Sequence, residues 1–532
     1  MAPPSLSPPR SPLLATLAGL LVLLGGCGGS RPGGTAQQLV VGFQGTIDTV
    51  DPAQATTVGA LQLLSAVGDP LYAIRADGAL EPRLATALPT LSSDGLRAVI
   101  PLRQGVRFHD GTPFDAEAMA FSLRRFLAIG KLSYVVGDRI RSVRVLDSHH
   151  LELVLSRPYG ALPQLLTSAS LTPVSPRAYW RHRDRFLPDA FVGTGPYRLG
   201  FTSPQLQRLE PFAGYWGPAP RNAGLALASL TTSSGLLGAL RSGQVDVLLS
   251  TSLQPDHQRA LHRKAAAGRL REGRGPALEI GYITLLSDRP PLQDPRLRRA
   301  LALSLDRPLL TARVSDGLRP PLRGLVPPSL LGALATWPSH DIAAARRLLR
   351  QAGWCQGRPL ELSLTYRSNV PSDRLFALTW QEALRRDLPD CLRLTLTGME
   401  STTAYRQLGD GAFQMILLDW IGDFPDADNY LMPLLACDRA VGNRCLEGAS
   451  ASSGSFWAAP GLQEQLVRTE TLTGPERLPV LHQVQQQVAA ASPYIPVWSV
   501  QPRAWARPGI SPPRFDGSGR LLLSQLSREV QP

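Results

Sequence analysis

The sequence predicts an α/β protein that folds into more than one compact unit, and three observations support this prediction. Short stretches with the period of a strand and stretches with the period of a helix occur together along the whole chain. The 532 residues, of which 43% are hydrophobic and 18% charged, exceed what one ordinary core accommodates. One apolar run, residues 13–24, lies near the N-terminus, and no second candidate membrane span follows it.

The N-terminus has the pattern of an export signal. Arg10 precedes the apolar run, which has the length of a signal-peptide core and is short for a membrane span. The run ends in LGGC at residues 24–27, which resembles the lipobox of bacterial lipoproteins and implies that Cys27 carries a diacylglycerol. We therefore expect a lipoprotein signal peptide at 1–26 and a flexible Gly/Ser/Pro-rich tether at 27–35. An uncleaved signal anchor is the alternative.

Four further cysteines predict disulfide bonds, because an even number of cysteines in an exported protein fits a paired set. Pairing of sequence neighbours would join Cys355 to Cys391 and Cys437 to Cys445, although three connectivities are open. A metal site is the competing interpretation. Neither a CxxC motif nor a suitably spaced histidine supports it.

The basic charge does not indicate nucleic-acid binding. The net charge is +13, and only two of the 55 basic residues are lysines. A nucleic-acid interface needs a localised basic stripe with interleaved aromatic residues, whereas the arginines here are scattered. A solvated surface, attracted to anionic lipid headgroups, is the better interpretation.

Local patterns in the first part of the chain predict individual elements. We expect a buried strand at 38–43, an ordered turn at 45–52, a helix near Ala60, a strand opening at residue 71 and a short helix at 82–88. The alternation in residues 97–103 and 151–155 predicts two half-buried strands. Between them, Asp115 is placed as a helix N-cap, with Phe114 and Met119 at the positions of a hydrophobic staple.

The second part of the chain has equally clear helix signals. Asp294 followed by Pro295 predicts an N-cap and a proline at the first helical position. Asp341 is placed to cap another helix, which Gly353 would end. Residues 360–416 have the pattern strand, helix, strand, helix, strand.

Six motifs, taken together, resemble family 5 of the bacterial extracellular solute-binding proteins. This group includes receptors for dipeptides, oligopeptides and nickel. In chain order the motifs lie at residues 74–126 (containing SDGLRAVIPLRQGVRFHDGTPFDAEAMAF), 194–199 (TGPYRL), 242–248 (SGQVDVL), 295–307 (PRLRRALALSLDR), 344–354 (AARRLLRQAGW) and 419–430 (DWIGDFPDADNY). The resemblance extends over nearly the whole mature chain.

The resemblance implies a two-lobed, periplasmic-binding-protein-like type II fold with a hinge, closing over a solute. Carried over to this sequence, lobe I would comprise residues 36–277 and lobe II residues 278–489. Residues 490–532 would return to lobe I, and 279–285 would be the strand that enters lobe II. The family further implies an ABC importer, whose permease in the inner membrane would receive a short peptide from this lipid-anchored, monomeric receptor outside the cytoplasm.

The resemblance also implies a binding residue. In peptide-binding relatives the Asp of a Trp-x-Gly-Asp pattern pairs with the α-ammonium of the peptide, and here that residue is Asp423. It follows an apolar strand, as ligand residues of α/β clefts do. A capping role, or a place in a solvated acidic loop with Asp426 and Asp428, is the alternative. Trp420 is expected near the wall of the pocket.

The opposite end of the peptide is assigned to Arg367. In dipeptide-binding relatives an Arg at the end of a strand of lobe II, before a helix, pairs with the carboxylate of the ligand, and Arg367 precedes a helix that Ser372 could cap. A guanidinium fork fits a carboxylate. The turn at 45–52 could line the pocket from lobe I, while His109 is expected in a loop without a ligand role.

Other functions are less well supported by the sequence. A nickel chelate, haem or an oligosaccharide are alternative solutes of the same fold. An exported hydrolase is the distant alternative, because G-x-S-x-G, S-x-x-K and HExxH motifs are absent from the sequence. We therefore expect no catalytic residues, no metal site and no cofactor.

Overall fold

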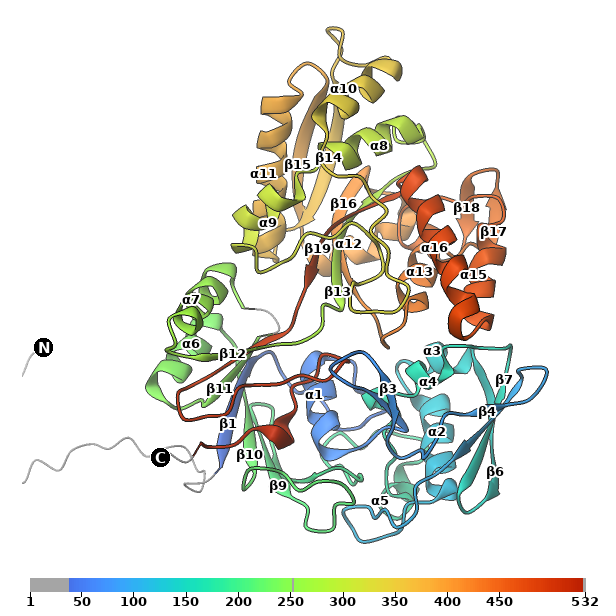
Figure 1. The fold of residues 1–532 in the computed structure, drawn as a ribbon, viewed down its shortest axis with the longest axis vertical. Helices are drawn as coiled ribbons and strands as arrows, with labels where there is room; N and C mark the ends of the chain where they lie inside the picture. The colour runs from blue at the N-terminus through green and yellow to red at the C-terminus, as the bar shows by residue number, and fades with distance from the viewer. Residues whose placement is uncertain (1–37, 251–252, 530–532) are drawn as a thin grey trace, which may run out of the picture.

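The computed structural model describes residues 38–250 and 253–529, which form two lobes joined by two chain crossings (Figure 1). Lobe I comprises residues 38–274 and 503–529, and lobe II comprises residues 279–500. Each lobe has its own sheet and its own buried apolar clusters, so the predicted two-lobed α/β fold is confirmed. Cys27, the signal peptide and the tether lie outside the described residues.

The main sheet of lobe I is built around β1, which pairs in parallel with β10 on one side and β11 on the other. In sheet order its strands are β12 (Arg271–Arg274), β20 (Arg503–Ala506), β11 (Val247–Ser250), β1 (Leu39–Gln44), β10 (Leu225–Leu230), β9 (Leu206–Pro211) and β8 (Tyr197–Thr202). Leu39 and Val41 are buried in one apolar cluster, while Val40 packs against another. Apolar groups therefore cover both faces, which is why β1 lacks the alternation of a half-exposed strand.

A second, four-stranded antiparallel sheet of lobe I accompanies α2 (Ala116–Ile129). Its strands are β4 (Thr90–Leu91), β5 (Arg97–Pro101), β7 (His150–Leu155) and β6 (Ile140–Asp147). The carboxylate of Asp115 accepts a hydrogen bond from the amide of Ala118, which confirms the predicted N-cap. Phe114 and Met119 are buried in the same cluster, as the predicted staple requires.

The remaining elements of lobe I are short. They are the hairpin β2 (Tyr72–Ile74) and β3 (Leu80–Pro82), the helices α1 (Val58–Val67), α3 (Ser133–Gly137), α4 (Leu162–Leu165), α5 (Pro176–Tyr179), α6 (Ser233–Ser242) and α7 (Pro255–Ala266), and the 3-10 turns η1 (Ala169–Leu171), η2 (Trp180–His182) and η4 (Leu523–Gln525). None of the helices in residues 38–250 and 253–529 is long and apolar enough to cross a membrane.

Lobe II contains a five-stranded sheet with the order β15 (Leu392–Met399), β14 (Leu360–Arg367), β16 (Met415–Ile421), β13 (Glu279–Leu285) and β19 (Tyr494–Val500). The pattern predicted for residues 360–416 is confirmed, because α11 (Pro371–Asp387) and α12 (Ser401–Arg406) alternate with β14, β15 and β16. The predicted caps Asp294 and Asp341 begin α8 (Pro295–Ser304) and α10 (Ile342–Gln351). The other elements are α9 (Arg307–Ser315), η3 (Leu408–Asp410), α13 (Asp428–Leu435), β17 (Arg439–Val441), β18 (Arg444–Glu447), α14 (Ala449–Ser452), α15 (Leu462–Thr471) and α16 (Gly474–Ala491).

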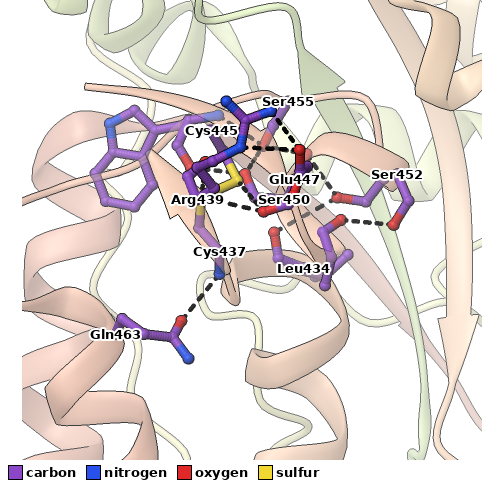
Figure 2. The surroundings of a disulfide bond; sticks show 12 residues. Leu434, Cys437, Arg439, Cys445, Glu447, Ser450, Ser452, Ser455 and Gln463 are labelled. Atoms are coloured by element: carbon purple, nitrogen blue, oxygen red, sulfur yellow. Dashed lines mark hydrogen bonds and ion pairs between the residues drawn. A yellow bond between two sulfur atoms is a disulfide. The ribbon is translucent and has the colours of Figure 1, made fainter. Parts of the chain in front are cut away.

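Two disulfide bonds lie in lobe II. Cys355 pairs with Cys391 and Cys437 pairs with Cys445, which is the pairing between sequence neighbours. The second bond closes the β17–β18 hairpin directly after α13 (Figure 2). The amide of Cys437 also donates to Oε1 of Gln463 at 2.9 Å, which joins this hairpin to α15 (Figure 2).

The two crossings between the lobes run side by side (Figure 1). β12 pairs antiparallel with β20 in lobe I, and β13 pairs antiparallel with β19 in lobe II. Between these pairs, the amide of Gly275 donates to the carbonyl of Pro502 at 2.9 Å. The hinge therefore consists of two short segments, residues 275–278 and 501–502, that are bonded to each other.

Two local predictions differ from the structure. Residues 82–88 form no helix. Pro82 pairs with Tyr72 and Ala85 forms a β-bridge with Leu102, so these residues pair with neighbouring extended segments instead. The return to lobe I was placed at residue 490, but β19 pairs with β13 in lobe II. The chain joins the sheet of lobe I only at β20.

His109 has a structural role in lobe I. Its Nδ1 accepts a hydrogen bond from the amide of Gly193 at 3.3 Å, and its Nε2 lies 3.1 Å from the carbonyl oxygen of Gly195. Burial lowers the pKa of His109 to about 4, so the ring is neutral and can accept at one nitrogen while it donates at the other. The HDG and TGPY motifs thus hold each other in place.

Candidate binding site between the lobes

A cavity of about 770 Å³ lies between the lobes, beside the hinge. Its lining residues lie within the segments 61–83, 167–169, 196–221, 274–278, 421–430 and 513–525. The volume falls within the range of roughly 300–1,000 Å³ that is usual for small-molecule sites. A second cavity of about 690 Å³ adjoins it and shares part of its lining, including Arg274 and Phe515.

Asp423 contributes a carboxylate from lobe II to the larger cavity. Among the described residues, its side chain has no hydrogen bond or ion pair. The side chain is accessible to solvent, yet the walls of the cavity reduce its hydration, and this desolvation raises the pKa of Asp423. Asp423 is therefore an unpaired anion that a cationic group of a ligand can reach.

The loop that carries Asp423 is fixed by neighbouring groups. The hydroxyl of Tyr430 accepts a hydrogen bond from the amide of Gly422 at 3.1 Å and donates to the carbonyl of Leu278 in the hinge at 2.5 Å. The Nε1 of Trp420 donates to the carbonyl of Asn429 at 2.6 Å. Trp420 does not line the larger cavity, so its role in the structure is to hold this loop.

The neighbouring acids Asp426 and Asp428 are not available to a ligand in the same way. Nη1 of Arg477 bonds to Asp426 at 2.8 Å, and Nη2 bonds to Asp428 at 2.6 Å. All three side chains are buried. The alternative of a solvated acidic loop therefore does not describe this segment, in which Asp423 alone among the three acids faces the larger cavity.

Arg367 is held inside lobe II and lines neither interlobe cavity described above. Its Nε donates to Asp373 at 2.7 Å, and its Nη1 lies 2.6 Å from a carboxylate oxygen of Asp419. Burial by itself would lower the pKa of Arg367, but these two carboxylates outweigh it, raise the pKa and compensate the charge. The geometry therefore gives no support to Arg367 as the partner of a ligand carboxylate. The helix after it begins at Pro371, with Val370 rather than Ser372 at the N-cap position.

The lobe I wall contains a cluster of polar groups that satisfy one another. Asp69 accepts hydrogen bonds from Arg83 at 2.8 Å, from the hydroxyl of Tyr215 at 3.1 Å and from Nε1 of Trp216 at 3.0 Å. The turn at 45–52 lines neither interlobe cavity. Its Asp51 instead forms a buried ion pair with Arg125.

Charges without a partner remain around the larger cavity. In the described chain, Asp423 and Glu81 are the unpaired acids of its lining, and Arg221, Arg514 and Arg520 are the unpaired cations. The other charged lining residues have partners, as Arg274 does in Glu272. The cavity thus offers free groups of both signs, which suits a ligand that carries both charges.

Sequence reasoning missed the part of this wall formed by residues 513–525. The segment Asp516-Gly517-Ser518-Gly519 has the composition of a turn, and this signal could have identified a hairpin. Which way Arg520 faces depends on how that hairpin packs against lobe I. Only the folded chain contains this information.

The comparisons with known proteins agree with this two-lobed architecture. Residues 79–442 match the profile of "Bacterial extracellular solute-binding proteins, family 5 Middle". The glutathione-binding protein GsiB of Escherichia coli O1:K1 / APEC is 26% identical over 414 residues, which cover 75% of this chain and 78% of that protein.

Two solved structures have the same fold. NikA from Brucella suis in complex with Fe(III)-EDTA aligns with a TM-score of 0.79 at 21% identity, covering 92% of this chain and 100% of that chain. A dipeptide binding protein from Pseudoalteromonas sp. SM9913 in complex with Met-Leu aligns with a TM-score of 0.73 at 20% identity, covering 93% and 100%.

Two lobes, a hinge of two crossings and a cavity between the lobes define the class of extracytoplasmic solute-binding proteins. The chain belongs to family 5 of the bacterial extracellular solute-binding proteins. It is therefore the substrate-binding component of an ABC importer, and its relatives are binding proteins rather than enzymes.

Proposed function

We propose that this protein captures short peptides with a free N-terminus in the larger cavity between its lobes, with Asp423 binding the α-ammonium. The observation that carries the proposal is an unpaired carboxylate in a cavity of peptide size beside the hinge. A charge-assisted hydrogen bond to such a group contributes roughly 1.5–3 kcal/mol.

The names of relatives support a peptide cargo. GsiB is a glutathione-binding protein, one structural neighbour was solved with Met-Leu, and another, MppA, is a murein tripeptide binding protein. These ligands are peptides, although the structural neighbours are too distant in sequence to transfer a ligand by themselves. Asp423 therefore remains the stronger argument.

Calorimetric titration of the full-length chain tests the proposal with Ala-Ala, tri-alanine, Met-Leu and glutathione, each with a free or an acetylated α-amino group. We expect N-acetylation to weaken binding by about 10- to 100-fold, since the acetylated nitrogen carries no charge. Asp423→Asn should weaken binding of the free peptide by the same factor and leave the affinity for the acetylated peptide unchanged.

Asp410→Asn, which removes an exposed carboxylate elsewhere on lobe II, is the matched control and should bind as the wild type does. Glu81→Gln separates the two unpaired acids of the cavity. Equal affinity for free and acetylated peptides would contradict the role of Asp423, and loss of this discrimination in Glu81→Gln alone would transfer the role to Glu81.

A chelated metal ion is a second candidate cargo, because unpaired arginines line the same cavity and NikA was solved with Fe(III)-EDTA. Titration with Fe(III)-EDTA under the same conditions distinguishes the two candidates. Tighter binding of the chelate than of every peptide would favour the chelate.

We also propose that Cys27 carries a lipid anchor outside the cytoplasm. In this proposal the protein is a monomeric receptor without enzymatic activity, and it binds no nucleic acid or cofactor. Its lobes close on the solute before the solute is delivered to a permease. The LGGC sequence at the end of the apolar run supports the anchor. Cys27→Ser should prevent labelling of the chain by a radioactive fatty acid in cells. Persistent labelling would contradict an anchor at this cysteine.

A further inference from the structure

Arg520 projects from a hairpin of lobe I that closes one side of the larger cavity. Phe515 and Leu521 form an antiparallel bridge, and the amide of Asp516 donates to the carbonyl of Arg520 at 3.0 Å. The carboxylate of Asp516 in turn accepts hydrogen bonds from the amides of Ser518 at 3.0 Å and Arg520 at 2.8 Å. The turn therefore has a single well-defined conformation.

The same hairpin is bonded to the body of lobe I. Gln62 of α1 donates to the carbonyl of Leu521 at 2.9 Å and accepts from its amide at 2.8 Å. The amide of Gly517 donates to the carbonyl of Ile74 at 2.8 Å. The backbone that presents Arg520 is thus fixed before any ligand arrives, which is the arrangement that a specific binding group requires.

The guanidinium of Arg520 has no partner in the described part of the chain, neither a hydrogen bond nor an ion pair. The nearby carboxylate of Asp516 already accepts hydrogen bonds from the amide and the hydroxyl of Ser518 within the turn. Burial lowers the pKa of Arg520 despite the opposing influence of Asp516, so the folded protein does not compensate this charge. A partly buried cation without a partner is unfavourable unless something else pairs with it.

The other two unpaired cations of the cavity differ from Arg520 in exposure. Arg221 and Arg514 are exposed, whereas Arg520 is partly buried. Water and salt weaken an ion pair with an exposed arginine, and they weaken it less in a partly buried position. Arg520 is therefore the cation that would contribute most to the recognition of an anion.

We propose that Arg520 binds the terminal carboxylate of the ligand, so that the cavity selects short peptides in which both ends are free. This inference depends on the proposed function, because the second contact is the ammonium at Asp423. Asp423 belongs to lobe II and Arg520 to lobe I. A zwitterionic peptide would join the two lobes and favour their closure, whereas a ligand with one charged end would engage one lobe.

A double-mutant cycle tests this assignment. The tightest-binding peptide of the panel and its C-terminal amide are titrated against the full-length wild type, Arg520→Gln and Arg520→Lys. We expect amidation and Arg520→Gln each to weaken binding by about tenfold or more. Their combination should weaken binding no further than either change alone, and Arg520→Lys should recover part of the loss.

Arg347→Gln, at an exposed position of α10 that lines neither interlobe cavity, is the matched control for loss of one positive charge and should bind as the wild type does. Thermal unfolding of each variant checks that the fold is retained. Additive losses in the cycle, or undiminished sensitivity to amidation in Arg520→Gln, would overturn the assignment. An equal loss of affinity in Arg514→Gln or Arg221→Gln would also overturn it. The ligand carboxylate would then respond to the total positive charge of the cavity and not to Arg520 in particular.

The two proposals fail in different ways. If no peptide of the panel binds, the peptide cargo is wrong and the role of Arg520 is wrong with it. If peptides bind and depend on their free ammonium, but amidation changes nothing, only the role of Arg520 is wrong.

Discussion

The three acids of the loop at residues 423–428 differ in function because their side chains face different surroundings. Asp426 and Asp428 turn toward Arg477 inside lobe II, where the ion pairs compensate their charge. Asp423 faces the cavity and has no such partner in the described residues. Desolvation by the cavity walls raises its pKa, and a ligand cation would lower that pKa again by stabilising the charged form.

The raised pKa of Asp423 predicts that peptide binding depends on pH. The carboxylate is fully charged above its pKa in the free protein and becomes neutral as the pH falls through that value, so affinity should fall on acidification. The loss should begin at a higher pH than for an ordinary aspartate, whose pKa is about 3.9.

Dissociation constants for one peptide between about pH 8 and about pH 4 measure this dependence. Asp423→Asn removes the titrating group, and its affinity should be weak and nearly constant over the range. An identical pH dependence in wild type and variant would show that another group is responsible.

At the scale of elements, the hinge is a pair of short segments, residues 275–278 and 501–502, each of which connects a strand of lobe I to a strand of lobe II. β12 and β20 pair in one sheet and β13 and β19 in the other, so the two crossings cannot move independently. Gly275 lies between them, and a Cβ added there would come within 2.7 Å of Cγ of Pro502 and 3.1 Å of Cγ of Phe515. The close contact of the crossings depends on a residue without a side chain.

Gly275→Ala should therefore destabilise the protein. Separating the crossings by enough to admit a methyl group costs about 1–3 kcal/mol, as in other overpacked sites. Urea unfolding monitored by tryptophan fluorescence measures the change.

Gly238→Ala is the matched control, because Gly238 lies in the exposed part of α6 with no atom within 4 Å of an added Cβ. This change should stabilise the helix by about 0.5–1 kcal/mol. Similar stability changes for the two variants would contradict the argument from close packing.

At the scale of the whole molecule, the lobes touch at a second place besides the hinge. Phe424 of lobe II is buried in an apolar cluster of lobe I. The carboxylate of Glu470, at the end of α15, lies 2.6 Å from Arg139 and 3.2 Å from Arg157 of lobe I. Figure 1 shows α15 and α3 on facing sides of the two lobes in this region. These contacts favour the closed arrangement and are lost if the lobes separate.

Glu470→Gln should shift the ligand-free protein toward an open arrangement, because two arginines lose their carboxylate while the side chain keeps its size. Removing one partner of a buried pair costs up to roughly 3–5 kcal/mol, and less here because Arg157 is about one-third exposed. Small-angle scattering should show a larger radius of gyration for the variant, and saturating peptide should reduce it.

Glu382→Gln removes an exposed acid from α11 and serves as the control, with scattering like that of the wild type. If Glu470→Gln scatters in the same way as the control, the contact does not contribute to closure. Peptide affinity measured on the same samples would show whether closure and binding are linked, as population shift requires.

The sequence by itself determined the class of fold, most of the strands and helices, several helix caps and the position of Asp423 just past a strand. These features depend on hydrophobic periodicity and on residues close in the chain, so the pattern of neighbours is sufficient to predict them. The sequence also contained the pairs of cysteines, although not their connectivity.

Only the tertiary structure decided which charged groups remain free. Arg367 and Arg520 are both arginines beside turns, but two carboxylates from other elements pair with the first, while the second is left facing the cavity. The strand at 494–500 likewise belongs to lobe II because it pairs with β13 of that lobe. Pairing of charges and of strands depends on distances between residues far apart in the chain, and these are set only when the lobes fold and meet.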